Sequence, residues 1–362
     1  KEVEKIIQNA ISKNRRYGVD SAYVVVMNPK TGEVLSLAGK RIEGGKWIDD
    51  SAGTYLKTFL PGSSVKGATV LTGLTNGVIK PGEVIYDRTL NFNGLQKGSY
   101  QDLGPVNDLT ALERSSNVYM FYIGMRLAGF NYDCYCWTGD QTGDPAFRAA
   151  IQKYREMFHQ FGLGVPTGID LPYEATGYKG STLALGLVAD FGIGQYDTYT
   201  PLQLAQYVST IANDGYRMKP QLVTEIRERG VNGEPGELIK RFEPELLNRV
   251  NADPEYIERV QNGFYRVTHG SRGTAKGVPG AAKTGTAEVG ARGSGLENHA
   301  LVGYAPYENP EMAYAIVVPS VSGGITNREI GTQIVEKYFE LKDEPYALNT
   351  NEEAVPVVTE EQ

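Results

Sequence analysis

The chain has 362 residues, of which 41% are hydrophobic and 22% charged, so it is long enough to bury a large core. No run of about 18 apolar residues predicts a membrane span, and the first residues, KEVEKIIQ, do not have the pattern of a signal peptide. The net charge of −7 falls mostly on residues 343–362, which we expect to form an acidic, flexible tail. The rest is nearly neutral, and no basic stripe predicts nucleic acid as a partner.

The N-terminal part of the chain predicts a helix followed by a hairpin. Residues 1–15 carry apolar side chains at helical spacing, namely Val3, Ile6, Ile7, Ala10 and Ile11. Residues 20–40 then resemble two strands. The sequence between these strands, Asn28-Pro29-Lys30-Thr31-Gly32, has the composition of a turn.

The C-terminal part predicts three more strands and a helix. The strand-like runs are 282–288, 299–305 and 312–319. A helix is expected over 326–341, with Thr326 and Glu329 as a capping-box pattern. Together with the N-terminal strands, these runs suggest one sheet built from both ends of the chain, in a single α/β unit.

Residues 55–265 are expected to be mostly helical, and their first candidate motif is PGSSVKGATVLTGL. Ser63 stands where a helix begins, and Lys66 lies one turn later on the same face. A serine hydroxyl needs a base to become a nucleophile, and a lysine is a base only when its cation is disfavoured by burial or by a second cation. The alternative interpretation is a capping serine followed by a surface lysine.

A second candidate motif is the S-x-N of Ser115 and Asn117, at the start of an apolar helix. The hydroxyl is suited to relay a proton, and the carboxamide both donates and accepts hydrogen bonds, which suits a peptide group. Ser12-Lys13-Asn14 also matches this pattern, so a helix cap is the alternative here as well.

A third candidate motif lies in AAKTGTAE, where Lys283 precedes Thr284 and Thr286. A phosphate loop is excluded, because Ala282 occupies the position before the lysine where that loop requires glycine. A plain β-strand is the other interpretation. The earlier Lys-Thr-Gly, at Lys30, is explained by the turn of the hairpin.

The three motifs gain weight from their order, S-x-x-K, then S-x-N, then K-T-G, which is the signature of penicillin-binding proteins and class A β-lactamases. Beyond the motifs, four segments resemble the transpeptidase domain of class B, monofunctional penicillin-binding proteins: FGLGVPTGIDLPYE, IGQYDTYTPLQLAQYVSTIANDG, KTGTAE and VGYAP. The resemblance covers residues 1–342. It implies a central antiparallel five-stranded sheet flanked by the terminal helices, with a large helical part over about 55–265.

The resemblance also implies roles for the motif residues. Ser63 would be the acylated nucleophile, Lys66 its base, and Ser115 the proton shuttle. Asn117 would bind the peptide group of the substrate, and Lys283 would keep the site positively charged. The segment Thr284, Gly285 and Thr286 would bind the carboxylate of the substrate. The backbone amides of Ser63 and Thr286 would form the oxyanion hole.

The implied reaction is acyl transfer from D-Ala-D-Ala stem peptides of peptidoglycan to a neighbouring amine, with β-lactams as covalent inhibitors and no metal or cofactor. Water as the acceptor would make the protein a D,D-carboxypeptidase or a β-lactamase. In the nearest match to the E-x-x-L-N motif of β-lactamases, Pro244 holds the position of the glutamate. A β-lactam sensor that does not turn over is a further alternative.

The resemblance places the domain outside the bacterial cytoplasmic membrane, with a membrane anchor outside this chain and cell-wall synthesis proteins as partners. Cys134 and Cys136 lie outside the pattern of the family. With a single residue between them, they are expected to be two structural thiols rather than a disulfide.

Overall fold

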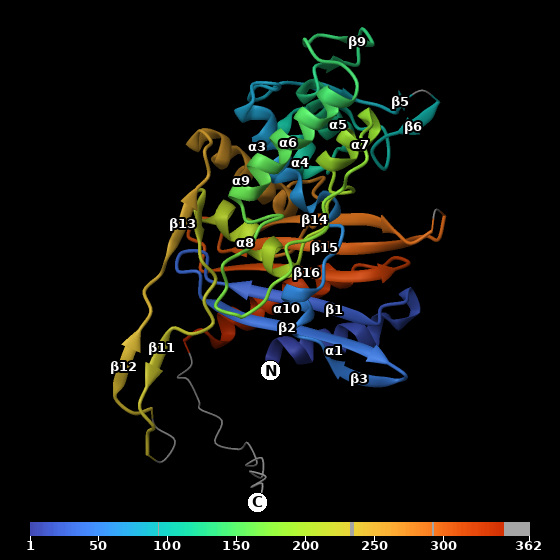
Figure 1. The fold of residues 1–362 in the computed structure, drawn as a ribbon. Helices are drawn as coiled ribbons and strands as arrows, with labels where there is room; N and C mark the ends of the chain where they lie inside the picture. The colour runs from blue at the N-terminus through green and yellow to red at the C-terminus, as the bar shows by residue number, and fades with distance from the viewer. Residues whose placement is uncertain (93, 232–234, 292, 344–362) are drawn as a thin grey trace, which may run out of the picture.

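A six-stranded antiparallel sheet forms the centre of the computed structural model, which describes residues 1–92, 94–231, 235–291 and 293–343 (Figure 1). Its strand order is β14-β15-β16-β1-β2-β3. The strands are β1 (Ser21–Met27), β2 (Val34–Glu43), β3 (Lys46–Asp49), β14 (Ala281–Val289), β15 (Leu296–Ala305) and β16 (Met312–Val321). The prediction of one sheet built from both ends of the chain is confirmed. The expected acidic tail falls almost wholly on residues 344–362, outside the described residues.

The expected number of five strands is wrong, because β3 adds a sixth at the edge of the sheet. β3 pairs with β2 across a turn at Gly44 and Gly45, both with positive φ. Its four residues, Lys-Trp-Ile-Asp, are mostly exposed and lack the alternation of a half-buried strand. An edge strand of this kind is held by backbone pairing, which leaves little trace in the sequence.

The hairpin predicted at the N-terminal end is confirmed. β1 pairs with β2, and the Asn28 side chain accepts hydrogen bonds from the backbone N–H of Lys30 (2.9 Å) and of Thr31 (3.3 Å). Gly32 has a φ of 81°. The first Lys-Thr-Gly therefore completes a turn.

The side chains of the sheet alternate between two cores. Val24 and Val26 of β1 pack with the apolar faces of α1 (Glu2–Asn14) and α10 (Thr326–Leu341). Val25 and Met27 face the other way, into the core of the helical part. The buried helix α8 (Pro201–Ala212) lies on that second face, against β1 and β16. The predicted helical face of residues 1–15 is confirmed.

The capping box expected at the start of the last helix is wrong. Ile325 is the N-cap residue, and Thr326 is already helical, with a buried hydroxyl for which no hydrogen bond is found among the described residues. Glu329 instead accepts hydrogen bonds from Lys13 Nζ (3.2 Å) and Asn14 Nδ2 (2.8 Å) of α1. The carboxylate therefore joins the two terminal helices, because Asn14 is buried against α10 and needs an acceptor.

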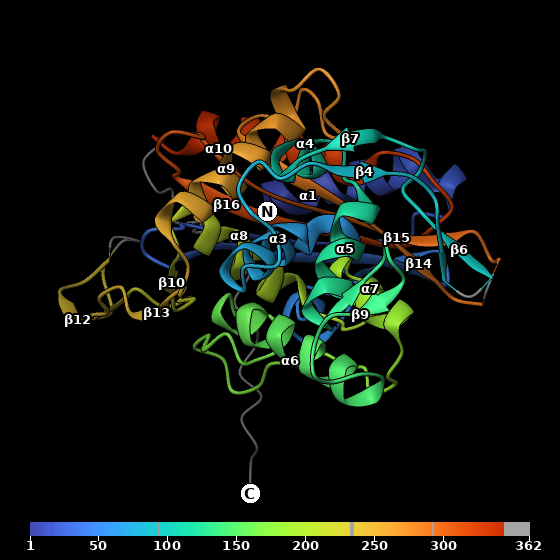
Figure 2. The same ribbon diagram turned by 90° about the horizontal axis from the view of Figure 1, so that it is seen from above.

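The helical part gathers beside β14 (Figures 1 and 2). Its α-helices are α2 (Gly53–Leu56), α3 (Lys66–Thr75), α4 (Asp108–Glu113), α5 (Asn117–Leu127), α6 (Asp144–Gln160), α7 (Leu185–Gly192), α8 and α9 (Pro254–His269). The 3-10 turns are η1 (Arg15–Tyr17), which follows α1, and η2 (Gly62–Val65), which precedes α3. In the described ranges, no helix is both long enough and apolar enough to cross a bilayer.

The helical part also contains short two-stranded sheets, which were not predicted from the sequence. Their pairs are β4 (Ile85–Asp87) with β7 (Gly104–Val106), β5 (Leu90–Phe92) with β6 (Leu95–Lys97), β8 (Phe130–Asn131) with β9 (Cys136–Trp137), β10 (Tyr216–Met218) with β13 (Leu246–Arg249), and β11 (Glu225–Arg227) with β12 (Leu238–Arg241). The β11–β12 pair projects away from the body of the molecule (Figure 1).

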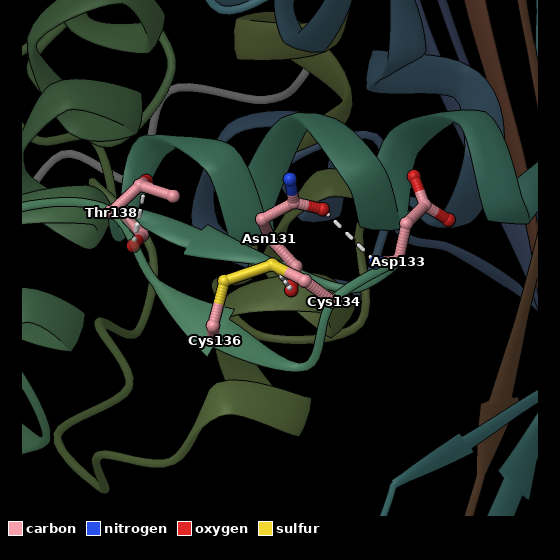
Figure 3. The surroundings of a disulfide bond; sticks show 6 residues. Asn131, Asp133, Cys134, Cys136 and Thr138 are labelled. Carbon is pink, nitrogen blue, oxygen red and sulfur yellow. Dashed lines mark hydrogen bonds between the residues drawn. A yellow bond between two sulfur atoms is a disulfide. The ribbon is translucent and has the colours of Figure 1, made fainter.

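The expectation of two free thiols is wrong, because Cys134 and Cys136 form a disulfide in the β8–β9 hairpin (Figure 3). Tyr135 between them is in the left-handed region, with a φ of 51°. The resulting turn leaves the two Cα atoms 5.3 Å apart, within the range of ordinary disulfides. Spacing alone does not reveal such a turn.

Glu329→Ala should lower the free energy of unfolding by about 1–3 kcal/mol, because it takes an acceptor from the buried amide of Asn14. Urea unfolding followed by circular dichroism would measure the change. Glu340→Ala on the same helix is the control, since its ion pair with Lys337 lies at the surface and its loss should stay within about 0.5 kcal/mol. Equal losses for the two variants would contradict a stabilising role of the Asn14–Glu329 contact.

Candidate active site

A cleft of about 1250 Å³ runs between the edge strand β14 and the helical part. Residues of all three sequence motifs line it, namely Ser63, Ser115, Asn117, Thr284, Gly285 and Thr286. The two remaining motif residues, Lys66 and Lys283, are completely buried next to it. The fold therefore brings the three motifs together in one place, as the sequence predicted.

Glycines bring the backbone of η2 into contact with β14. Gly62 has a φ of 54°, and a side chain there would collide with the backbone of Thr286. A side chain at Gly285 would collide with the carbonyl oxygen of Pro61. On the other side, the Gly62 N–H donates to the carbonyl of Gly194 (3.1 Å). The backbone at Ser63 is consequently fixed beside the backbone at Thr286.

Lys66 is held by acceptors from the S-x-N motif. Its Nζ donates to the carbonyl oxygen of Ser115 (2.8 Å) and to Asn117 Oδ1 (2.7 Å), and it lies 3.3 Å from Ser115 Oγ. Its backbone N–H donates to the carbonyl of Ser63, which fixes the one-turn spacing between these residues. Burial, and then repulsion from Lys283, hold the pKa of the Lys66 amine well below its usual range.

Lys283 reaches the same serine from the opposite side. Its Nζ donates to Ser115 Oγ (2.9 Å) and to the carbonyl oxygen of Thr284 (2.9 Å). Burial lowers the pKa of the Lys283 amine to about 7. The Ser115 hydroxyl thus lies between two amines that both lose their protons far more easily than ordinary lysines, and this arrangement can pass a proton across the cleft.

Ser115 itself adopts a conformation that is rare for a residue with a side chain, with a φ of 55°. The helix-capping role considered for it belongs to its neighbour, because Ser116 Oγ accepts from the backbone N–H of Tyr119 (3.0 Å) at the start of α5. Ser115 is therefore free of capping, and its hydroxyl points to the two lysines.

Asp87 of β4 supports this loop, and sequence reasoning missed it. Its completely buried carboxylate accepts hydrogen bonds from the hydroxyls of Ser99 (2.6 Å) and Ser116. Ser99 Oγ in turn accepts from the backbone N–H of Asn117 (2.8 Å). The Asp87 charge also raises the pKa of Lys66, opposing Lys283. No motif marks an isolated aspartate in a three-residue strand, so the sequence carried no usable signal.

The Asn117 side chain makes hydrogen bonds within the protein through both its oxygen and its nitrogen. Its oxygen accepts from Lys66, and one N–H of its amide donates to the carbonyl of Gly98 (3.0 Å). The second N–H of the amide is the group left for a ligand. Asn117 therefore has a structural part in joining α3, α5 and the loop after β6, besides the binding role expected from the sequence.

The hydroxyl of Thr284 meets that of Thr274, at an Oγ1–Oγ1 distance of 2.8 Å. The Thr274 carbonyl accepts from Arg328 Nη1 (3.1 Å), and Arg328 also lines the cleft. Thr286, two residues further along β14, is exposed. This end of the cleft therefore presents hydroxyls and a guanidinium.

Two other features can be compared with this arrangement, a histidine of the sheet and the segment that resembles the β-lactamase motif. His299 is a residue of β15 that lines the cleft, and its Nε2 lies 2.9 Å from Glu297 Oε2. The segment that partly matches the β-lactamase motif is not among the residues lining the cleft. Its Glu245 pairs with Lys219 (2.8 Å), and Asn248 accepts from Arg217 (2.7 Å).

Known proteins share both the sequence and the fold. The family model described as the penicillin binding protein transpeptidase domain matches residues 22–338. Penicillin-binding protein 2A of Bacillus subtilis is 45% identical over 94% of the chain, and the peptidoglycan D,D-transpeptidase MrdA of Haemophilus influenzae is 24% identical over 87%. The solved structure of penicillin-binding protein 2B from Streptococcus pneumoniae has a TM-score of 0.86 and 33% identity, with 96% of this chain and 59% of that one covered.

The chain spans about half the length of these curated relatives, 51% of penicillin-binding protein 2A and 52% of MrdA. The family match, in contrast, takes in all three motifs and nearly the whole sheet. By fold, motif geometry and sequence, the chain belongs to the penicillin-binding protein transpeptidase family, as a class B member.

Proposed function

We propose that the protein is a peptidoglycan D,D-transpeptidase in which Ser63 is acylated by stem peptides ending in D-Ala-D-Ala. The observation that carries the proposal is the Ser115 hydroxyl lying between the buried amines of Lys66 and Lys283. Of these two lysines, Lys66 lies one turn after Ser63. Membership of the family supports it, as does the name of the relative from Haemophilus influenzae. β-Lactams would acylate the same serine.

In the first half of the proposed reaction, Ser63 Oγ attacks the carbonyl carbon of the penultimate D-alanine. Lys66, neutral because burial and Lys283 disfavour its cation, takes the hydroxyl proton. The backbone amides of Ser63 and Thr286 stabilise the oxyanion, and donors of this type are typically worth about 10²–10³ in rate.

The C–N bond to the last D-alanine then breaks, and its nitrogen receives the proton from Ser115, which is resupplied from Lys66. Lys283 keeps the cluster positive on balance, while Thr284, Gly285 and Thr286 hold the carboxylate of the substrate.

In the second half of the proposed reaction, the amine of a neighbouring stem peptide loses a proton to Lys66 through Ser115 and attacks the acyl-enzyme. The ester bond to Ser63 Oγ then breaks, and this oxygen takes the proton back from Lys66, so the products are a cross-linked peptide and free Ser63.

Asn117 would donate its remaining amide N–H to the peptide group of the substrate. The same Asn117 keeps Lys66 in place through its side-chain oxygen. The role of Asn117 in the proposal is therefore both binding and positioning.

Peptidoglycan lies outside the cytoplasmic membrane, so the proposed location of the domain is the extracytoplasmic face, with cell-wall synthesis proteins as its partners.

A carboxypeptidase or a β-lactam sensor would use the same acylation step. Release of D-alanine that requires an added amine acceptor supports the transpeptidase. Release without an acceptor supports the carboxypeptidase, and acylation by β-lactams without release of D-alanine supports the sensor.

Ser63→Ala should abolish covalent labelling by a fluorescent penicillin, because it removes the attacking oxygen. Intact-mass spectrometry with peptide mapping would locate the adduct in the unmodified protein. Ser64→Ala is the matched control, since the Ser64 hydroxyl is buried and donates to the Pro61 carbonyl (2.9 Å), away from the reaction. An adduct that persists in folded Ser63→Ala, on any residue, would contradict the assignment.

The pH dependence of acylation should shift in opposite directions in two charge variants. Acylation needs neutral Lys66, so its rate rises as pH increases through the pKa of that lysine. Lys283→Ala removes a repelling cation, which raises this pKa and moves the rise to higher pH. Asp87→Asn removes an attracting anion, which lowers it and moves the rise to lower pH.

Second-order rate constants of acylation by a chromogenic β-lactam, measured between about pH 5 and 10, would record both shifts. The Lys283 effect should be largest below about pH 7, where that lysine carries its own proton. Shifts in the same direction, or no shift in either variant, would mean that Lys66 is not the titrating base.

A further inference from the structure

The cleft contains an arginine, Arg328, that has no carboxylate partner among the described residues. Lys97, another cation that lines the cleft, pairs with Asp190 (2.6 Å). Arg328 lines the same cleft, yet in the part of the chain that the structure describes no carboxylate pairs with its guanidinium. Burial lowers the pKa of the Arg328 guanidinium from its usual value. An arginine stays protonated under such conditions.

The side chain of Arg328 is anchored beside the predicted carboxylate-binding residues. Arg328 is the third residue of α10, and its Nη1 donates to the carbonyl of Thr274 (3.1 Å). The Thr274 hydroxyl lies 2.8 Å from that of Thr284. Thr274 thus contacts both Arg328 and Thr284. The guanidinium has five N–H donors, and the Thr274 carbonyl accepts from one of them.

The lysine of the K-T-G motif is poorly suited to supply the charge that a carboxylate needs. Its amine is completely buried, its pKa is lowered to about 7, and its Nζ is engaged with Ser115 and the Thr284 carbonyl. Burial therefore disfavours the charged form of Lys283. A cation that faces the cleft is better placed to compensate the charge of an ionised ligand.

We propose that Arg328 binds the carboxylate of the acyl donor, together with the Thr284 hydroxyl, and thereby selects donors that end in a free carboxylate. The proposal rests on the proposed function, since it specifies the ligand of the same site. The charge-assisted hydrogen bonds of a guanidinium suit a planar carboxylate in particular, because two of its N–H groups can face the two oxygens.

A purely structural role for Arg328 is the alternative, because its bond to Thr274 holds the loop that follows α9. The two interpretations differ in one measurable way. A structural arginine affects all ligands alike, whereas a carboxylate-binding arginine affects only ligands that carry the carboxylate.

The test compares acylation by a β-lactam acid and by its methyl ester, in the unmodified protein and in Arg328→Gln. Glutamine retains an N–H donor for the Thr274 carbonyl but has no charge. In the unmodified protein the acid should react faster than the ester. In Arg328→Gln the acid should react roughly 10- to 100-fold more slowly, with the ester rate changed by less than about 2-fold. Arg328→Lys should restore part of the preference for the acid.

Lys276→Gln is the matched control. Lys276 carries the same charge as Arg328 and is exposed on the loop that contains Thr274, but it does not line the cleft. It should change neither rate. Equal slowing of acid and ester in Arg328→Gln, or an unchanged preference, would overturn the role of Arg328 while leaving the proposed function intact. Failure of both ligands to acylate the unmodified protein would instead overturn the proposed function, and this inference with it.

Discussion

The burial of two lysine amines around one serine hydroxyl is the constraint on which the site depends. Lowering the pKa of Lys283 from 10.5 to about 7 corresponds to a free-energy cost on the order of 5 kcal/mol below about pH 7, and this cost fades as the pH rises towards the pKa of an ordinary lysine. Whole domains are typically stable by only about 5–15 kcal/mol. A fold that buries Lys66 as well must therefore offset this cost elsewhere, and two extensive apolar cores on the two faces of the sheet do so.

The architecture explains how such burial coexists with access for a large ligand. β14 is an edge strand, so one side of its backbone is paired with β15 and the other is turned to the helical part. The lysines lie inside, where α3, α5 and β14 meet, while the hydroxyls of Ser63, Thr284 and Thr286 lie at the cleft. The proposed base is thus shielded from water while the proposed nucleophile is accessible from the cleft.

The chemically distinctive parts of the site could be predicted from the sequence, because each motif joins reactive residue types at a spacing that one helical turn or one strand imposes. Ser63 with Lys66 is such a pair, and the order of the three motifs linked it to the others. Asp87 and Arg328 could not be found in this way, since their importance comes from the tertiary contacts of common residue types with segments far away in the chain.

The errors come from pairing and backbone conformation that a local sequence pattern does not encode. The strand β3 is specified by pairing with β2 rather than by its own pattern, and the turn at Tyr135 brings two cysteines into bonding range that their spacing argued against. Thr326 and Glu329 match the capping-box pattern, but the Glu329 carboxylate accepts a hydrogen bond from the buried Asn14 of α1 instead. The first two errors concern neighbouring segments, a hairpin and a tight turn, whereas the third comes from a contact between helices at opposite ends of the chain.

The direct contact of η2 with β14 through Gly62 and Gly285 has a consequence for how the protein tolerates mutation. A side chain at either glycine would meet backbone atoms, which cannot move aside as the end of a flexible side chain can. Gly194 is constrained in the same way, because a side chain there would collide with the backbone of Gly62. Substitution at any of these three glycines should therefore displace the main chain on which the proposed oxyanion hole depends.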